Sequence, residues 1–174
     1  MSYDGSSRGA VSMFDDEQVK GRVWLYQQSP YHQVQMIGDL AFVRFQASKH
    51  GFHAHEFGNL TEGCISTGAH FNPYGSTHGG LDTPTRHLGD FGNIEVDSSG
   101  GAHLDLTLPK NVSLLGDLSL VGRSLVIHEK EDDLGKGSDP ESKITGNAGP
   151  PISCAIIGMA DSKTAAMWCR RQHL

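Results

Sequence analysis

The stretch GFHAHEFG, residues 51–58, contains two histidines separated by one residue. If this stretch is a strand, His53 and His55 point to the same face, because side chains alternate between the two faces of a strand. Two imidazoles would then converge on one point, which suits a metal ion. Two partly exposed strand histidines would give the same pattern, so the pair needs further support.

That support comes from more histidines and one aspartate in glycine-rich sequence or at the end of an expected strand. They are His70, His78, His87, Asp90 and His128. Imidazole binds zinc and copper well, and a carboxylate is a common additional ligand. Six histidines and one aspartate exceed what a single tetrahedral site requires. The sequence therefore predicts a site for two metals.

Length and composition are those of one globular domain with its own core: 174 residues, of which 22 are glycine and 10 are histidine. The net charge of −6 gives no basic footprint for nucleic acid, so we expect no nucleic-acid partner. No apolar run is long enough for a membrane span, so we expect no membrane association. The first residues lack the pattern of a secretory signal, and we therefore expect a cytoplasmic location.

Five segments are expected to be strands: 19–27, 33–46, 103–108, 119–128 and 152–160. Residues 19–27 and 103–108 alternate between apolar and polar side chains, which is typical of half-buried strands, and the last segment, ISCAIIGMA, is continuously apolar and fits a buried strand. Ser29 and Pro30 mark a turn between the first two. Short strands, many glycines and no strong helix favour an all-β fold, namely an antiparallel sandwich or barrel.

Three segments do not fit strands. Residues 58–92 and 129–151 are long, glycine-rich and polar, and loops of this length in a compact domain are usually functional or disordered. The tail, residues 161–174, is polar and locally basic, and we expect it to be loose or weakly helical.

Several motifs together resemble the copper/zinc superoxide dismutase family, from about residue 10 to residue 160. They are GFHAHEFG, GAHFNP, HGG, RHLGDFGN, GRSLVIHEKEDDLGKG and TGNAG, in the order and spacing of the family. The resemblance implies a Greek-key antiparallel β-sandwich or barrel with two long functional loops, formed by residues 1–160 and followed by a C-terminal extension, 161–174. It also implies copper and zinc as cofactors and superoxide as substrate.

The resemblance assigns a role to each matched residue. Copper ligands, which are also the catalytic residues, would be His53, His55, His70 and His128; zinc ligands would be His70, His78, His87 and Asp90, with His70 shared. Asp132 matches an aspartate that links a copper-ligand histidine to a zinc-ligand histidine, and such partners orient the imidazoles. The histidines without a match are expected at the surface: His32, His50, His103 and His173.

Cys64 and Cys154 match the family's disulfide within one subunit. In the chain-entropy model, closing a loop of this length stabilises the fold by up to roughly 4–5 kcal/mol. Cys169 matches nothing and is expected to stay free. Its spacing to His173 would also suit a soft metal, but such a pair is weak evidence.

The sequence departs from the family at the position of an arginine that attracts the substrate anion. Pro151 stands there and has neither a charge nor an N–H group. Ile144 stands where a lysine is usual, and residues 129–149 contain three lysines against six acidic residues. A charge-assisted hydrogen bond contributes roughly 1.5–3 kcal/mol, so its loss is expected to slow the reaction by about one to two orders of magnitude.

Two other functions fit the same residues. The chain could be a copper- and zinc-binding protein without catalysis, which the missing arginine favours and the complete ligand set disfavours. It could also be the dismutase-like domain of a copper chaperone, although the CxxC domain and CxC tail of such proteins are absent from this sequence. The resemblance further suggests a homodimer, through CAIIGMA, and a copper chaperone as a partner.

Overall fold

The structure, a computed structural model, describes residues 7–44 and 48–170. Its strands are β1 (Arg8–Asp15), β2 (Val19–Gln27), β3 (Gln35–Phe42), β4 (Ser48–His55), β5 (Thr61–Cys64), β6 (Asp90–Val96), β7 (Gly101–Thr107), β8 (Ser124–His128), β9 (Pro151–Ile156) and β10 (Gly158–Ala160). Two short 3-10 helices, η1 (Ile65–Thr67) and η2 (Pro140–Lys143), lie in the loops, and one α-helix, α1 (Ser162–Arg170), follows the last strand.

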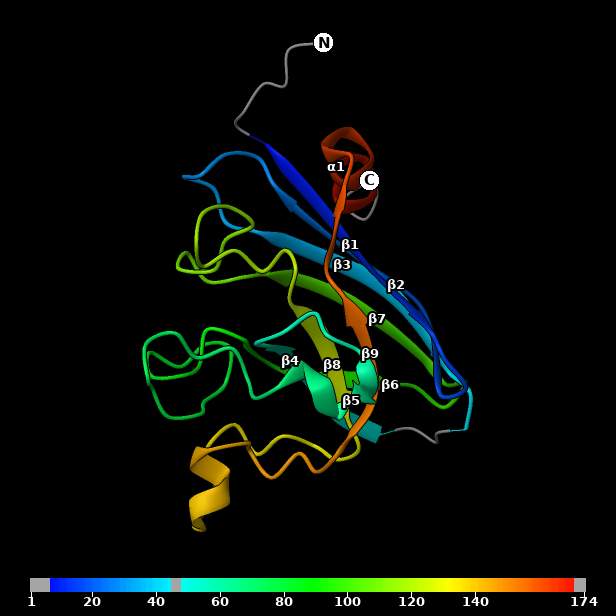
Figure 1. Cartoon of the computed structure of the whole chain (residues 1–174). Helices are drawn as coiled ribbons and strands as arrows, with labels where there is room; N and C mark the ends of the chain where they lie inside the picture. Colours follow the sequence, from blue (N-terminus) through cyan, green and yellow to red (C-terminus); the bar gives the residue numbers. More distant parts are fainter. Residues whose placement is uncertain (1–6, 45–47, 171–174) are drawn as a thin grey trace.

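Two antiparallel sheets form a sandwich, which confirms the expected fold class (Figure 1). One sheet has the strand order β10-β1-β2-β3-β7, and the other has the order β6-β4-β8-β9. The chain crosses between the sheets after β3, so that β3 pairs with β7 and β4 pairs with β8, as in a Greek key. Large side chains from both sheets, such as Phe14, Phe52 and Ile127, fill the space between them.

The alternation seen in residues 19–27 has its expected consequence in β2. Val23 and Leu25 are fully buried in the core, whereas Lys20 lies in solvent on the opposite face. Burying an aliphatic side chain of this size stabilises the fold by roughly 1.5–3 kcal/mol. Because a shift of one residue would turn these side chains outward, the pattern also determines the register of the strand.

Two expected strands are shorter than the sequence indicated, and a third is shifted. In place of 33–46, β3 ends at Phe42, and residues 45 and 46 lie outside the described ranges. In place of 119–128, β8 begins at Ser124, because Gly122 has a positive φ of 88° in the preceding turn. The segment 103–108 is extended as expected, although β7 runs one residue short of it and starts two residues earlier.

The run 152–160 is not one buried strand, so that expectation was wrong. It divides into β9, in the four-stranded sheet, and β10, in the five-stranded sheet. Ile157 lies at the crossing, where its N–H donates to the carbonyl of Arg123. Ile156 and Met159 are 43% and 72% exposed, so the run is not buried throughout.

Three further strands lie in stretches that the sequence analysis did not assign to strands: β1, β5 and β6. β5 and the start of β6 lie within residues 58–92, so the expectation that this segment contains no strand was wrong. Along β1 the buried residues Ala10, Ser12 and Phe14 alternate with more exposed ones, a period-two pattern that was present in the sequence. β6 begins at Asp90, inside the segment expected to be loop. Its hydrogen bonds to β4 decide its conformation, since its glycine-containing sequence alone is a weak strand signal.

Residues 162–170 of the tail form a helix, so the helical alternative of the expectation agrees with the structure there and the loose one does not. Helix α1 packs on the outer face of the five-stranded sheet, where the rings of Trp168 and Trp24 lie nearly parallel with centroids 6.0 Å apart. The guanidinium of Arg22 lies 5.1 Å from the Trp168 ring, a cation–π contact. Gly9 allows the close approach, because a Cβ atom there would come within 2.8 Å of Ala165.

The cysteines pair as the resemblance implied. Cys64 and Cys154 form a disulfide that connects β5, in the first long loop, to β9, with a Cα–Cα distance of 5.7 Å. Cys169 is free, and it is buried between α1 and the sheet, with its sulfur 3.9 Å from the carbonyl of Gln35. Burial raises the pKa of the Cys169 thiol to about 11. Within residues 7–44 and 48–170, no helix has the length and apolarity needed to cross a membrane.

We expect Trp168→Ala to lower the free energy of unfolding by about 1–3 kcal/mol, less than the full burial of a tryptophan would give because the ring is only partly covered. Urea denaturation measures the change. Lys163→Ala on the exposed side of α1 is the matched control and should have little effect. Equal stabilities of the two variants would contradict the docked position of the helix.

Candidate metal centre

Strand β4 carries the two histidines at the start of the site. His53 and His55 are both buried, and their ring centroids lie 6.4 Å apart on the same side of the strand. β4 is the central partner of β6 and β8, so neighbouring strands hold it on both edges. The last residue of β8 is His128, and a single bridge joins His55 to His70 of the first long loop. The sheet and the loop thus bring four distant histidines together.

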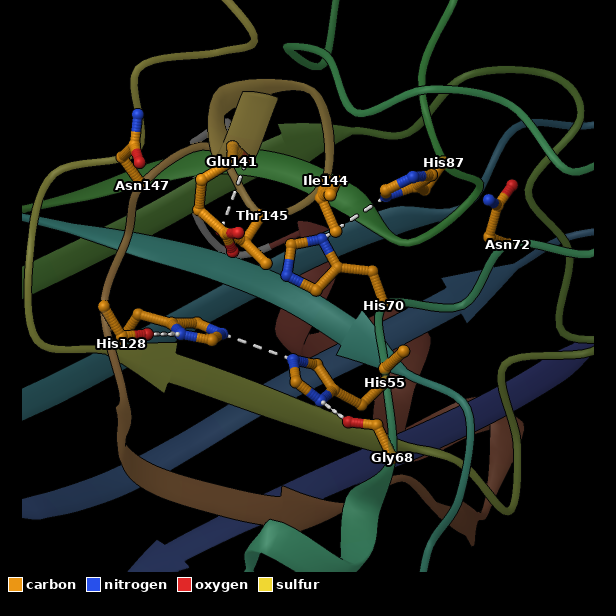
Figure 2. A pocket seen from close by; sticks show the side chains of 12 residues that line it. His55, Gly68, His70, Asn72, His87, His128, Glu141, Ile144, Thr145 and Asn147 are labelled. Carbon is orange, nitrogen blue, oxygen red and sulfur yellow. Dashed lines mark hydrogen bonds between the residues drawn. The ribbon is translucent and has the colours of Figure 1, made fainter. Parts of the chain in front are cut away.

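These four histidines can share one metal ion. His53, His55, His70 and His128 each offer a nitrogen, and the four nitrogens lie within 4.8 Å of one another. The Nδ1 of His55 donates to the carbonyl of Gly68, and the Nδ1 of His128 donates to that of Gly149, both over 2.8 Å. The two Nε2 atoms therefore face each other, 3.2 Å apart, across the site (Figure 2).

A second group gathers around the carboxylate of Asp90. The Nδ1 atoms of His70 and His87 lie 3.0 Å and 3.2 Å from its Oδ1, and the Nδ1 of His78 lies 3.1 Å from its Oδ2. A set of donor atoms close enough to share an ion comprises His53, His70, His78 and Asp90. His87 lies outside that set but contacts both His70 and Asp90.

Buried atoms without partners support the presence of metal ions. The Nδ1 of His53 and the Nε2 of His70 are buried, and neither makes a hydrogen bond within the described structure. A buried nitrogen without a partner is costly unless something else satisfies it. Both atoms belong to the groups that can hold an ion, and a metal would satisfy them. The residues present therefore fit two metal ions, and the donor sets suit copper and zinc.

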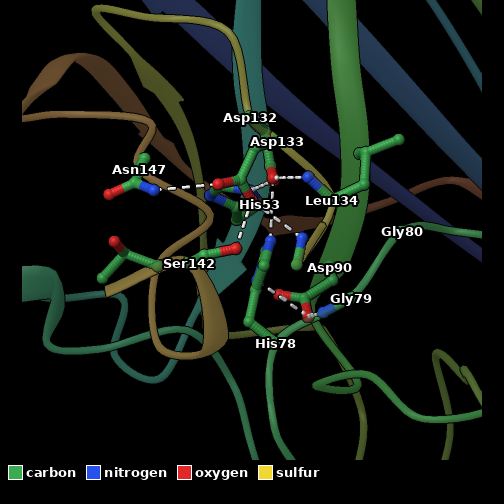
Figure 3. A network of polar contacts seen from close by, with 12 residues as sticks. His53, His78, Gly79, Gly80, Asp90, Asp132, Asp133, Leu134, Ser142 and Asn147 are labelled. Atoms are coloured by element: carbon green, nitrogen blue, oxygen red, sulfur yellow. Dashed lines mark hydrogen bonds and ion pairs between the residues drawn. The ribbon is translucent and has the colours of Figure 1, made fainter. Parts of the chain in front are cut away.

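Asp132 links the two groups (Figure 3). Its Oδ2 accepts from the Nε2 of His53 over 2.6 Å, and its Oδ1 accepts from the Nε2 of His78 over 2.8 Å. The side chain of Asn93 holds the aspartate from both sides, accepting from its N–H and donating to its carbonyl. A side chain at Gly146 would collide with both Asp132 and His78, so a glycine is needed there.

Burial keeps most of the imidazoles neutral, which is the form that binds metals. Burial lowers the pKa of His55 to about 3 and that of His128 to about 4, and it lowers the pKa of His53 and of His70 as well. His78 behaves differently: burial lowers its pKa, but hydrogen bonds to Asp132 and Asp90 outweigh burial and raise it to about 9.

The two aspartates are ionised in spite of their burial. Burial raises the pKa of Asp90, but hydrogen bonds from three histidines more than offset it and hold the pKa well below the ordinary range. The pKa of Asp132 falls to about 2 for the same reason, through His53 and His78. Buried carboxylates of this kind require nearby positive charge, which divalent metal ions supply.

A pocket of about 420 Å³ opens onto the first histidine group. His55, His70, His87 and His128 form part of its lining, and the second long loop contributes Glu141, Ile144, Thr145 and Asn147 (Figure 2). Pro151 is not part of this lining; it begins β9 and pairs with His128. Lys143, next to Ile144, donates its ammonium group to the carbonyl of Gly135 and so stays within its own loop.

Among the histidines expected at the surface, His32 and His103 are exposed, as expected, and His173 lies outside the described residues. His50 is buried, so the expectation was wrong for this residue. It stacks on Phe42, and its Nδ1 donates to the carbonyl of His128 over 2.8 Å. His50 thereby ties β4 to the end of β8, next to the site.

The sequence analysis did not find Asn93, Gly146 or the carbonyls of Gly68 and Gly149. All of them orient the histidine side chains or Asp132. Asn93 lies in the motif RHLGDFGN, and Gly146 and Gly149 lie in TGNAG, so the resemblance marked these positions without giving them a role. Their role follows only from the fold, which brings an amide, a glycine or a backbone carbonyl to an imidazole or a carboxylate.

Comparisons with known proteins agree with this geometry. The Dictyostelium discoideum Cu-Zn superoxide dismutase 5 is 50% identical over 112 residues, which cover 64% of this chain and 73% of the relative. The extracellular Cu-Zn superoxide dismutase of Drosophila melanogaster is 47% identical over 150 residues, covering 83% and 78%. The Cu-Zn superoxide dismutase of Cryptococcus neoformans var. grubii is 42% identical over 153 residues, covering 88% and 98%.

A solved structure is also similar. The crystal structure of the clock protein EA4 has a TM-score of 0.82 and 36% identity to this chain, and the match covers 89% of this chain and 96% of that one. The family model described as copper/zinc superoxide dismutase matches residues 19–157. On this evidence, the chain belongs to the copper/zinc superoxide dismutase family.

Proposed function

We propose that the protein converts superoxide to dioxygen and hydrogen peroxide, consuming two protons for every two superoxide anions. Copper supplies the one-electron exchange when it is bound, and zinc, which has no redox chemistry, has a supporting part. His53, His55, His70 and His128 would hold copper, and His70, His78, His87 and Asp90 would hold zinc. The relatives named above as superoxide dismutases support this activity.

The positions of the two ring nitrogens of His70 are the main observation behind this proposal. Its Nδ1 lies 3.0 Å from Asp90, in the group proposed for zinc, while its Nε2 is buried without a hydrogen bond on the side of the other histidines. His70 can therefore serve both metals. Its Nε2 can also hold a proton whenever that atom is not a metal ligand, and can deliver the proton to the product at the pocket.

Asp132 and the backbone orient the remaining ligands. Asp132 accepts from the Nε2 of His53 and so leaves the Nδ1 of that ring available to a metal. The carbonyls of Gly68 and Gly149 accept from the Nδ1 atoms of His55 and His128, so the Nε2 atoms of these two rings are available to a metal. A fixed tautomer and a fixed ring direction make each histidine a better ligand.

We propose further that the reaction is slow for this family, because Pro151 occupies the position of the arginine that guides the anion. No lysine or arginine is among the residues that line the described pocket, which supports the proposal. The alternative is a protein that binds copper and zinc without catalysis. The complete ligand groups favour catalysis, and only the weak guidance of the anion favours the alternative.

Other expectations stay predictions. A homodimer is supported by the exposed side chains of Ile65, Ile156 and Met159, which lie close in sequence to the two disulfide cysteines, and sedimentation equilibrium would test it. A cytoplasmic location and a copper chaperone as a partner stay predictions as well, and one relative is an extracellular enzyme.

The first experiment measures superoxide dismutation by protein loaded with copper and zinc, beside a metal-free sample. We expect activity only in the loaded sample. An unaltered protein that holds both metals but is inactive would favour the alternative function.

In His70→Ala, the affinity for both metals should fall together, because one side chain is shared. Mass spectrometry measures the metal content. Full retention of copper and zinc in this variant would contradict the assignment of His70 as a shared ligand.

The second prediction concerns Asp132. Because its carboxylate orients both His53 and His78, Asp132→Asn should weaken metal binding by about 10- to 100-fold, the usual effect of removing such a partner. Competition with a chelator measures the affinity. Asp117→Asn, at an exposed position, is the matched control. Unchanged metal affinity in Asp132→Asn would show that the aspartate is dispensable.

The third prediction concerns Pro151. Pro151→Arg should raise the second-order rate constant about tenfold or more without changing copper content, because it restores a cation near the pocket. The gain should shrink as salt rises, since screening shortens the reach of the charge. Val43→Arg adds the same charge at a remote exposed position and should give no such gain. If Pro151→Arg loads copper fully and gains nothing at low salt, the missing arginine does not limit the rate.

A further inference from the structure

The hydroxyl group of Thr67 contacts both a disulfide cysteine and one of the proposed copper ligands. Thr67 ends the 3-10 helix η1, which begins directly after Cys64, and it is fully buried. Its Oγ1 lies 2.7 Å from the carbonyl oxygen of Cys64 and 3.0 Å from the Nδ1 of His55. Threonine side chains often bond the carbonyl three residues earlier, so the first contact has a local explanation. The second contact has none, because it reaches a strand residue twelve positions away.

The proton positions in this chain of groups follow from the carbonyls at its two ends. The carbonyl of Gly68 lies 2.8 Å from the Nδ1 of His55 and can only accept, so that nitrogen carries the proton. The hydroxyl of Thr67 therefore accepts from the same N–H, in a three-centre bond, and donates its own hydrogen to the carbonyl of Cys64. The Nε2 of the neutral ring keeps its lone pair, on the side of His128 (Figure 2).

The backbone on both sides of Thr67 is fixed. The disulfide holds Cys64 to strand β9, which lies in the same sheet as His55. The carbonyl of Thr67 accepts from the N–H of Phe57, two residues beyond that histidine. Gly68 has a positive φ of 79°, and a Cβ atom there would lie 2.9 Å from the Phe57 ring, so a glycine is needed. The hydroxyl therefore has little freedom to turn away from the imidazole.

We propose that Thr67 is a positioning residue for copper, whose hydroxyl, held by the carbonyl of Cys64, fixes the ring of His55. Two acceptors on one N–H determine the tautomer and the rotation of the ring more tightly than the carbonyl of Gly68 does alone. Because the disulfide holds Cys64 in place, it also holds the hydroxyl in place. The inference rests on the proposed function in one respect, the assignment of His55 as a copper ligand.

Two substitutions separate the hydroxyl from the rest of the side chain. Thr67→Val removes the hydroxyl and keeps the shape, and Thr67→Ser keeps the hydroxyl. We expect the copper affinity of Thr67→Val to fall about tenfold, the lower end of the usual effect of losing an orienting partner, because the carbonyl of Gly68 remains. Thr67→Ser should retain the affinity. Competition with a chelator measures it, and the electron paramagnetic resonance spectrum of bound Cu(II) should change in Thr67→Val alone.

Zinc affinity distinguishes a positioning role from a merely structural one. The hydrogen bonds given for Thr67 in the described structure reach none of the proposed zinc ligands, so Thr67→Val should leave zinc affinity unchanged. A general loosening of the loop would lower the affinity for both metals, because His70 lies only three residues further along the chain. Loss of copper and zinc affinity together would therefore overturn the proposal, as would unchanged copper affinity.

Thr83→Val is the matched control in the same long loop. The hydroxyl of Thr83 also donates to the carbonyl three residues earlier, that of Gly80, over 2.7 Å, and its other bond goes to the carbonyl of Thr85. Neither bond involves a histidine. Thr83→Val should therefore leave copper affinity and the copper spectrum unchanged, and a loss equal to that of Thr67→Val would overturn the proposal.

The part played by the disulfide is measured in a double variant, Cys64→Ser with Cys154→Ser. With the bond removed, the carbonyl at position 64 no longer holds the hydroxyl, so adding Thr67→Val should cause much less than the tenfold loss expected in the disulfide-bonded protein. An equally large loss in both backgrounds would contradict the role of the disulfide. Should the double variant fail to fold, the single variants at Thr67 and Thr83 decide the proposal by themselves.

His55→Ala separates failure of this inference from failure of the proposed function. If His55→Ala keeps full copper affinity, the proposed ligand set is wrong and the inference fails with it. If His55→Ala loses copper while Thr67→Val retains it, only the inference fails. The affinities and the spectrum do not depend on turnover, so selective loss of copper in Thr67→Val supports the inference even in a protein without dismutation activity.

Discussion

The buried carboxylate of Asp132, shared between His53 and His78, is the interaction on which the site depends. It connects strand β4 to the first long loop, and the second long loop supplies the carboxylate itself. Three segments that share no regular hydrogen-bonded ladder are thereby held at one point. An ionised group buried this deeply is stable only with partners on both oxygens, so its loss would loosen both loops and both histidine groups together.

The β-sandwich contributes rigidity that the loops lack. β4 and β8 are central strands of one sheet, and their ends carry His55 and His128. The disulfide between Cys64 and Cys154 attaches the first long loop to β9 in that same sheet. A metal site needs ligands held to within fractions of an ångström, and strands meet that requirement better than loops do. The loops then supply the ligands and the pocket wall that the sheet cannot.

The interior of the site and its entrance differ in chemistry. Inside, low imidazole pKa values and ionised aspartates suit metal binding. At the entrance, Ile144 and Glu141 stand where an anion would benefit from a cation. Because charge at an entrance acts mainly on the encounter rate, the metal chemistry and the guidance of the substrate can vary separately. The slow rate proposed here follows from that separation.

Much of this protein could be predicted from sequence because its signals are local. The alternation in residues 19–27 determined the buried face of β2, and the histidines with Asp90 indicated a two-metal site by residue type alone. The resemblance to a family then implied that His70 is a ligand of both metals. The spacing of the histidines along the sequence could not have shown this. The pairing of Cys64 with Cys154 likewise came from resemblance, and the structure confirms it.

Other features were decided only by tertiary structure, because they depend on contacts between distant segments. His50 is buried by Phe42 and the end of β8, and helix α1 is stable where its tryptophan meets Trp24 of the sheet, although its sequence is polar. The division of 152–160 into two strands follows from the crossing between sheets at Ile157. Residue types determined which chemistry is available to this protein; the packing of the two sheets and two loops decided which atoms of those residues face each other.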